Sequence, residues 1–260
     1  EFCMKLCEPN NPLQVFTYDC NKIAEDFNIT SEEAGRKVRY EAYDHVANIL
    51  SQKYPKEKVK IATAHNANDQ AETVLLRLVR GSGGKGLGAM HQDTGKILRP
   101  LLDCSREEIE NYCQERKLQW VNDSTNDDIE FSRNFVRKKI FPCLEKLNPN
   151  FVGVICQTAK HLQNDEKILD NMSENILINL LEIDKLKTKN WQNLFPAIRT
   201  RILQKWLIKF GCMVNATHIE ALDKLILNGT SKKELALPGL TIKYAYHKLY
   251  VEKNKKHIRQ

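Results

Sequence analysis

The sequence predicts an α/β fold: a parallel sheet over the first part of the chain, followed by a mainly helical domain that closes with a β-hairpin. Up to about residue 120, short β-rich runs alternate with amphipathic helices, which is typical of βαβ units. Helical periodicity then replaces the strands over residues 131–229. Residues 234–252 return to strand patterns around a Pro238-Gly239 turn.

Each element expected in the first part follows from a local pattern. The strands are short runs rich in β-formers, and two helices begin at capping boxes, Thr30 with Glu33 and Ser105 with Glu108. In chain order we expect a strand at 13–19, a helix at 31–52, a strand at 58–64, a helix at 69–80, a strand at 97–102 and a helix at 105–117. The helix at 69–80 should bury one apolar face, formed by Ala71, Val74, Leu75, Leu78 and Val79.

Helical patterns dominate the second part of the chain. Pro149 breaks the first helix, Gly211 ends the third, and Thr217 with Glu220 forms a capping box for the fourth. The expected elements are helices at 131–147, 151–182, 194–210 and 217–229, then strands at 234–237 and 241–252. We place a domain boundary near residue 185.

Composition excludes several classes of protein. Hydrophobic residues make up 42% of the 260 residues and charged residues 28%, which are the values of a globular chain. No apolar run approaches the ~20 residues that cross a bilayer, and we recognise no secretory signal. The eight cysteines include no C-x-x-C pair, which favours a reducing cytoplasm over disulfides or a zinc ribbon. The net charge of +7 permits a polyanionic partner without requiring one.

The strongest chemical signal lies at 64–73, where an expected strand passes into a helix. Ligands of open α/β sheets lie beyond the carboxyl ends of the strands. Asp69 and Glu72 share one side of the first helical turn, beside His65 at the strand exit. Two carboxylates there suit Mg²⁺ and phosphate chemistry. The structural alternative is a capping box, with Asn66 as the N-cap and Asp69 as its acid.

A glycine-rich loop follows at 81–88. Its glycines match the letters G-x-G-x-x-G, yet they follow a helix, whereas the dinucleotide-binding fingerprint follows a strand. The loop carries Lys85 and adjoins Arg80, so it could close over a phosphate. A plain mobile connection is the alternative.

Several sequence blocks occur in the order of one family. The central blocks are His65-x-x-Asn68-Asp69-Gln70-x-Glu72-Thr73 and Arg77-Leu78-x-Arg80-Gly81-Ser82-Gly83-x-Lys85-Gly86-Leu87. The flanking blocks are Glu33-Ala34-Gly35-Arg36-x-x-Arg39-Tyr40, Arg99-Pro100-Leu101-Leu102, Trp120-x-x-Asp123-x-Thr125-Asn126, Arg133-Asn134-x-x-Arg137, Pro142-x-Leu144 and Leu237-Pro238-Gly239. Together they closely resemble the tRNA(Ile)-lysidine synthases over nearly the whole chain.

The resemblance implies a fold and a reaction. The family belongs to the ATP-pyrophosphatase, or PP-loop, class, whose nucleotide domain is Rossmann-like. Its members use ATP to adenylate the C2 oxygen of the wobble cytidine of an isoleucine tRNA with a CAU anticodon, and the ε-amine of free L-lysine then displaces AMP. The implied partners are ATP, Mg²⁺, L-lysine and tRNA, with no membrane, while the oligomeric state stays open. The implied domains are a partial nucleotide-binding domain at 1–148, a helical linker at 149–185 and a tRNA-docking domain at 186–260.

The resemblance also implies roles for single residues. Asp69 and Glu72 match the acidic pair that serves the metal and the attacking lysine, and His65 matches the histidine at the reacting nucleotide. Arg137 matches an arginine that meets tRNA or the reaction centre, so these four residues are the expected catalytic set. The expected substrate-binding residues are Arg36, Arg39, Arg80, Lys85, Arg133 and Asn134.

Some of these assignments have structural alternatives. Arg36 or Arg39 matches an arginine that reaches the active site, but both could instead pair with the acids Glu32 and Glu33 on a solvated helix face. Arg133 and Arg137 could likewise be surface charge. Many family members carry an aspartate where this chain has Asn68, which puts Asn68 in doubt as a metal ligand.

Two rival functions stay open. A tRNA 2-thiocytidine-type enzyme of the same class would need C-x-x-C cysteines, and the sequence has none. A non-catalytic tRNA-binding module is the other rival. In either case the residues at 241–260, where lysines alternate with Tyr244, Tyr246 and Tyr250, fit contact with RNA, or form an ordinary strand with a basic tail.

The sequence lacks the Ser-Gly-Gly-x-Asp-Ser loop whose amides hold pyrophosphate in this class. Ser82-Gly83-Gly84 matches only its first three letters, and the chain starts at Glu1, about where the third strand unit of the family starts. We therefore expect that the N-terminal segment has been lost, and predict that this 260-residue polypeptide alone binds ATP poorly and forms no lysidine. Incorporation of radiolabelled lysine into tRNA in the presence of ATP measures this, and detectable lysidine would contradict the prediction.

Overall fold

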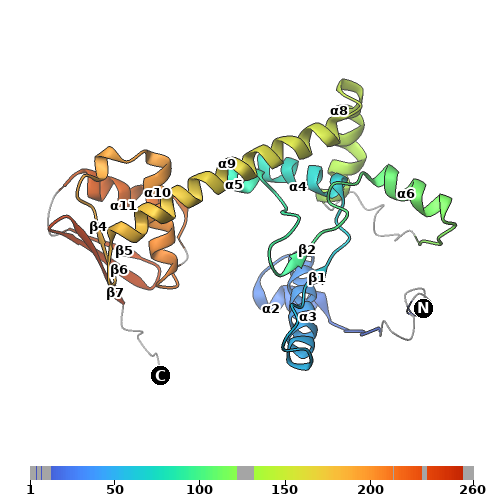
Figure 1. Ribbon diagram of the computed structural model, residues 1–260, viewed down its shortest axis with the longest axis horizontal. Helices are drawn as coiled ribbons and strands as arrows, with labels where there is room; N and C mark the ends of the chain where they lie inside the picture. The colour runs from blue at the N-terminus through green and yellow to red at the C-terminus, as the bar shows by residue number, and fades with distance from the viewer. Residues whose placement is uncertain are drawn as a thin grey trace. The chain divides into compact units, whose positions relative to one another are not determined.

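The computed structural model describes residues 4, 7, 13–121, 132–212, 214–229 and 233–253. The chain divides into two compact units, unit 1 (Glu1–Lys160) and unit 2 (His161–Gln260), and helix α9 (Phe151–Leu180) continues from one into the other (Figure 1). The three-part division at residues 148 and 185 stays a prediction. None of the helices in the described ranges is both long enough and apolar enough to cross a bilayer.

Unit 1 combines a small parallel sheet with helices, as the sequence predicts. Strand β1 (Ile61–Ala62) pairs in parallel with β2 (Ile97–Leu98). Both strands are shorter than the expected runs at 58–64 and 97–102. The helices of unit 1 before α9 are α2 (Cys20–Phe27), α3 (Ser31–Lys53), α4 (Ala67–Val79), α5 (Gly84–Leu87), α6 (Arg106–Glu115), α7 (Ser132–Phe135), the π-helix η2 (Val136–Ile140) and α8 (Phe141–Leu147).

Capping boxes begin three of these helices. The boxes predicted at Thr30 and Ser105 are both present, at the starts of α3 and α6. A third box, at Asn66, starts α4 two residues before the expected Asp69. Because a cap satisfies backbone N–H groups locally, these helix starts need no tertiary contact and can be recognised from sequence.

Residues 13–19 do not form the predicted strand. They are exposed, and within the described part of the chain no strand pairs with them. Asp19 instead caps the unexpected helix α2, since its carboxylate accepts hydrogen bonds from the backbone N–H groups of Asn21 and Lys22. An alternating run forms a strand only where a neighbouring backbone can take its hydrogen bonds.

The helix predicted at 131–147 contains a π-helical turn, η2, between α7 and α8. Val136 and Phe141 are five residues apart, yet both are buried in one cluster with Ala71 of α4. An α-helix would turn two such side chains about 140° apart. The wider π-turn brings both toward the core, and Arg137 lies within it.

The apolar face of α4 is shorter than predicted. Ala71 and Val74 are buried, but Leu78 and Val79 at the end of the helix are 58% and 86% exposed. The core of unit 1 therefore holds the first half of α4 most firmly, which is also the half that carries the acidic residues of the motif.

Unit 2 contains the predicted helices, but its sheet is larger than the terminal hairpin expected. Its five-stranded antiparallel sheet has the order β3-β4-β7-β6-β5. The elements after α9 are β3 (Leu181–Glu182), β4 (Lys185–Lys187), the 3-10 helix η3 (Trp191–Asn193), α10 (Pro196–Ile208), α11 (Ala216–Leu227), β5 (Lys233–Leu237), β6 (Leu240–Ala245) and β7 (Lys248–Lys253).

Two local predictions for unit 2 are wrong. The expected hairpin is formed by β5 and β6, but Tyr246 and His247 make a further turn, so the segment 241–252 contains most of β6 and nearly all of β7. Both turn residues have positive φ, 50° and 55°, without the Asn or Gly that usually signals such a turn. Helix α11 is capped by Asn215, whose box partner is His218, and not by Thr217 with Glu220.

An ion pair joins the helices of unit 2 inside its core. The Asp223 carboxylate accepts hydrogen bonds from Arg199 Nε at 2.9 Å and Nη2 at 2.9 Å, and from Trp191 Nε1 at 2.7 Å. Arg199 Nη1 also donates to the Leu194 carbonyl at 3.0 Å. The nearly buried charges are thus well paired, which offsets the cost of taking them out of water.

We predict that Asp223→Ala destabilises unit 2 by ~3 kcal/mol, because Arg199 and Trp191 Nε1 lose their acceptor. Urea unfolding followed by tryptophan fluorescence measures the change, since Trp191 and Trp206 lie in the core of this unit. The control is Glu220→Ala, an exposed residue of the same helix, which should change stability by less than ~0.5 kcal/mol. Equal losses in the two variants would contradict the prediction.

Candidate functional site

The acidic pair of the motif lies on the first turns of α4, where Asp69 has a structural role as well. Its Oδ2 accepts a hydrogen bond from the Asn66 N–H at 3.0 Å, and Asn66 Oδ1 accepts one from the Asp69 N–H at 3.0 Å. The capping-box alternative is therefore confirmed. It uses only one carboxylate oxygen, and Asp69 Oδ1 lies 3.6 Å from Arg137 Nη2.

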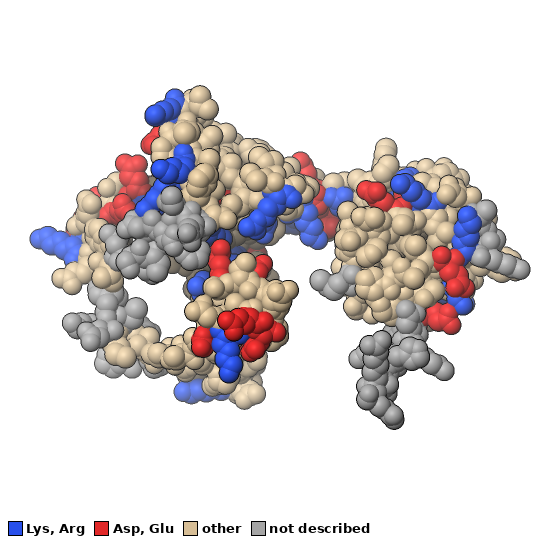
Figure 2. Space-filling model, turned by 180° about the vertical axis from the view of Figure 1, so that it is seen from behind, with Lys and Arg blue, Asp and Glu red and all other residues tan. Residues whose placement is uncertain are grey.

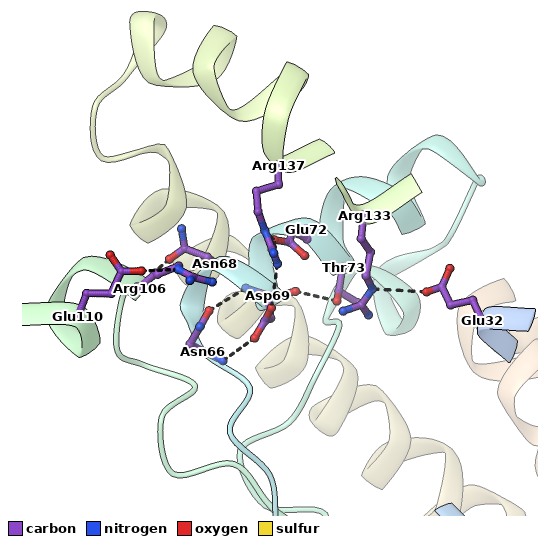
Figure 3. Close-up of polar contacts among 10 residues, drawn as sticks. All are labelled: Glu32, Asn66, Asn68, Asp69, Glu72, Thr73, Arg106, Glu110, Arg133 and Arg137. Carbon is purple, nitrogen blue, oxygen red and sulfur yellow. Dashed lines mark hydrogen bonds and ion pairs between the residues drawn. The ribbon is translucent and has the colours of Figure 1, made fainter. Parts of the chain in front are cut away.

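Glu72 is a fully buried carboxylate held by Arg137. Its side chain is 0% exposed, and its Oε1 accepts from Arg137 Nε at 2.8 Å and lies 2.7 Å from Nη2 (Figure 3). Burial raises the pKa of Glu72, and the charge and hydrogen bonds of Arg137 oppose that rise. Glu72 Oε2 has no hydrogen-bond partner among the described residues. The geometry therefore brings three of the four expected catalytic side chains together.

His65 lies at the exit of β1, as expected, and its ring is half-buried. Nδ1 lies 2.9 Å from Thr63 Oγ1. Burial lowers the pKa of His65, nearby arginines lower it further, and Asp69 opposes them. The imidazole is therefore neutral at neutral pH.

A groove of about 700 Å³ lies between the starts of α3 and α7 and the outer side of α4. Its basic side chains come from three separate elements: Arg36 from α3, Arg77 and Arg80 from the end of α4, and Arg133 from α7. We call this the arginine groove.

The groove is not purely basic, because Glu32 and Glu33 also line it. Arg133 Nε lies 3.9 Å from Glu32 Oε1. Figure 3 marks this ion pair with a dashed line.

The other expected substrate-binding residues do not line this groove. Arg39 and Lys85 are exposed elsewhere, and Asn134 is 8% exposed, so it faces the interior. Three of the six expected residues are thus gathered at one place.

Asn68, where many family members carry an aspartate, makes a structural hydrogen bond. Its Oδ1 accepts a hydrogen bond from the backbone N–H of Arg106, the first residue of α6, at 2.9 Å. The side chain thereby joins the start of α4 to the start of α6. An oxygen acceptor is all that this contact requires, so asparagine serves as well as aspartate.

Two polar residues of α4, the buried Gln70 and the partly exposed Arg77, have contacts that the sequence did not predict. Gln70 is 4% exposed and hydrogen bonds to the backbone of Met90, while Arg77 donates to the carbonyls of Gly86 and Ala89. The available signal was a polar side chain among core-facing positions of an amphipathic helix. The glycine-rich loop is consequently anchored to α4.

Asp69 and Glu72 fit Mg²⁺ only with help from a ligand. Within the described ranges no group of three or more His, Cys, Asp or Glu side chains could hold a metal ion. Mg²⁺ usually takes one or two carboxylates from a protein and completes its shell with water and substrate phosphates. The oxygens left for it are Asp69 Oδ1 and Glu72 Oε2.

The sheet of unit 2 differs from the expected RNA surface. Tyr244 is buried in the core, so it cannot stack on a base, whereas Tyr246 is 75% exposed. Lys243 pairs with Glu252 at 2.7 Å and Lys248 with Glu182 at 2.6 Å. In the view of Figure 2, acidic and basic side chains are likewise interspersed on both units. The basic residues after 253 lie outside the described residues.

Comparison with known proteins agrees with the α/β fold of unit 1. Residues 1–144 match the family described as PP-loop domain, and residues 186–250 match the TilS substrate binding domain. The first match alone covers more than half of the chain and defines the class. The chain belongs to the PP-loop family, and it is similar to curated proteins named tRNA(Ile)-lysidine synthase.

Three of these relatives illustrate the similarity. The tRNA(Ile)-lysidine synthase of Haemophilus ducreyi is 31% identical over 96% of this chain and 58% of its own length. That of Geobacter sulfurreducens is 34% identical over 83% of this chain and 47% of its length. That of Thermosipho africanus is 42% identical over 56% of this chain and 33% of its length. The chain spans about half the length of the curated relatives it matches.

We predict that Arg137→Gln destabilises unit 1 by ~3 kcal/mol at neutral pH, because it leaves the Glu72 carboxylate buried without a cation. Adding Glu72→Gln should restore most of the loss, and a double-mutant cycle of urea unfolding measures the coupling. The control is Lys139→Gln, an exposed side chain in the same π-turn. Additive losses from the two single variants would contradict the coupling.

The pH dependence of this cycle has a defined sign. Burial raises the folded-state pKa of Glu72 above the ordinary value of 4.5, so protonation favours the folded state. The stability that protonated Glu72 gives the folded state is fully present below pH 4.5, and it is lost as the pH rises through the folded-state pKa. The stability gap between Arg137→Gln and the double variant should therefore narrow as the pH falls from ~8 toward ~5.

Proposed function

We propose that this chain is part of an enzyme that converts the wobble cytidine of an isoleucine tRNA to lysidine. The O2 oxygen of the cytidine attacks the α-phosphorus of ATP, and pyrophosphate leaves. The ε-ammonium of L-lysine loses a proton, its nitrogen bonds to C2, and AMP leaves with O2. The PP-loop match, the TilS substrate binding domain match and the names of the relatives support this reaction.

The observation that carries the proposal is the buried Glu72–Arg137 pair beside Asp69. The reaction needs an acceptor for the ammonium proton and positive charge near the departing phosphates. Asp69 and Glu72 are carboxylates within reach of one guanidinium, so one cluster offers both functions. In our proposal they orient the lysine amine and accept its proton, and Arg137 offsets charge on the adenylated intermediate.

Mg²⁺ and His65 also have roles in the proposed reaction. Mg²⁺ would be held by Asp69 and Glu72 together with substrate phosphate, and would offset charge on the nucleotide. His65, as a neutral imidazole, would hydrogen bond to the reacting nucleotide at the strand exit.

The arginine groove would take the RNA backbone. Arg36, Arg80 and Arg133 provide cations from three elements, and guanidinium groups bind phosphate with two parallel hydrogen bonds. Unit 2 would dock the body of the tRNA, which the TilS substrate binding domain match at 186–250 supports. We place this work in the cytoplasm, in keeping with the seven free cysteines among the described residues.

A non-catalytic tRNA-binding module is the second candidate, because the 260 residues contain no Ser-Gly-Gly-x-Asp-Ser loop. The two candidates differ in what the gene's complete product does. A module binds the tRNA and leaves cytidine unchanged, whereas an enzyme consumes ATP and joins lysine to C2.

The test is lysine incorporation by the complete gene product with ATP and an isoleucine tRNA transcript bearing a CAU anticodon. We predict that Glu72→Gln lowers kcat ~10²–10³-fold. The substitution keeps the shape of the side chain but removes a carboxylate that orients the lysine amine and accepts its proton. The matched control is Glu115→Gln, an exposed acid at the end of α6, which should keep full activity. Full activity in Glu72→Gln would contradict the proposed site, and tRNA binding without any lysidine would favour the module.

A further inference from the structure

We propose that Gln70 and Arg77 are positioning residues that hold residues 86–90, and with them Met90, as a preformed part of the wall of the arginine groove. We call this segment the clamped loop. The inference rests on the proposed function of the groove as the site of the RNA backbone, and it adds that the loop is in place before RNA arrives.

The side-chain amide of Gln70 hydrogen bonds to both backbone groups of Met90 in the loop. Its Nε2 donates to the Met90 carbonyl at 3.0 Å, and its Oε1 accepts from the Met90 N–H at 2.9 Å. The same Nε2 lies 3.4 Å from the Gly88 carbonyl. Since the side chain is 4% exposed and both its nitrogen and its oxygen are hydrogen bonded to the loop, Gln70 acts on the loop and not on a ligand.

Arg77 holds the other side of the loop. Its Nη1 donates to the Gly86 carbonyl at 2.6 Å and to the Ala89 carbonyl at 3.2 Å, while the guanidinium also lines the groove. Ala89 is 8% exposed and has a φ of 53°, a conformation that is unfavourable for alanine and persists where the surroundings fix it. The loop is therefore held in a single defined shape.

The spacing of the two residues explains how one helix can do this. Gln70 and Arg77 are seven residues apart, or two helical turns, and so lie on the same side of α4. The first turns of that helix also carry Asp69 and Glu72. The wall of the groove and the acidic pair therefore share one rigid support.

A lid that closes over its ligand is the opposite arrangement. To open, this loop would have to release the hydrogen bonds of Gln70 and Arg77 and leave a buried amide unpaired, which is unfavourable. Met90, which lines the groove, is fixed by the same bonds. A preformed wall also lowers the ordering cost of binding.

The decisive variant is Arg77→Lys, which keeps the charge but replaces the longer, planar guanidinium whose Nη1 reaches both carbonyls. The probe is an anticodon stem–loop RNA with a CAU loop, bound to the 260-residue chain. We expect amide hydrogen exchange at Gly88 and Met90 to speed up ~10-fold in the free protein. RNA affinity should fall ~3- to 10-fold, with the dependence of log K on log salt unchanged, because no charge is removed.

Arg80→Gln is the matched control from the same helix end. It removes a groove charge without touching the loop contacts, so it should lower the salt slope by ~0.7–0.9 and leave loop exchange unchanged. Gln70→Ala is the second test of the clamp. It removes the Met90 contacts without any change of charge, and should reproduce the effects of Arg77→Lys.

Each contrary result has a distinct meaning. Unchanged affinity in both clamp variants, in spite of a loosened loop, would overturn the positioning role and leave the proposed function standing. A lower salt slope with unchanged loop exchange in Arg77→Lys would also overturn it, by showing a direct phosphate contact. Faster exchange that extends equally over α3 would show a general loss of stability, and the positioning role would again be overturned. A wild-type chain that binds no RNA would overturn the RNA role of the clamp, and lysine incorporation by the complete gene product would still decide the proposed function separately.

Discussion

A carboxylate without contact to solvent needs a cation beside it, and unit 1 is organised around one such pair. Glu72 is buried on α4, and Arg137 reaches it from the π-turn between α7 and α8. The same turn sends Val136 and Phe141 into the core cluster that Ala71 joins from α4. Packing and electrostatics therefore constrain the same contact, and a shift of either helix would disturb both. The chemistry of the site is part of the core and does not depend on a loop.

Helix α4 carries two groups of residues that build the candidate site. Its first turns present the carboxylates, and a stripe that includes Gln70 and Arg77 fixes the wall of the groove. Groups on a helix are held more accurately than groups on a free loop, which would suit the reaction that we propose, since it must align a base, a nucleotide and an amine. The groove itself combines arginines with Glu32 and Glu33, so the binding of a polyanion that we propose there would depend on where the charges lie and not on an excess of them.

The sequence predicted the features that depend on neighbouring residues, and it missed those that depend on residues far apart in the chain. The capping boxes at Thr30 and Ser105 are complete within four residues, and their helices begin where expected. The alternation of strands and helices indicated the parallel sheet, and the family resemblance selected the acidic pair. The run at 13–19 has the pattern of a strand but finds no partner strand in the described chain, which a local pattern cannot reveal. Gln70 and Arg77 acquire their roles only when residues up to twenty positions away fold back onto α4.

The π-turn at 136–140 sets a limit on how the length of this segment can vary. A π-turn is equivalent to an α-helix that has gained one residue, so a chain shorter by one residue here would form an uninterrupted α-helix. The residues on its two sides, such as Val136 and Phe141, would still face the core together, because residues four positions apart in an α-helix lie on one face. The loss of a second residue would rotate the two sides relative to each other by about 100°, and the arginine and the phenylalanine could then not both keep their present contacts. Alignments of relatives that place a gap of two residues in this stretch would therefore mark chains in which the acidic pair must find a different counter-charge.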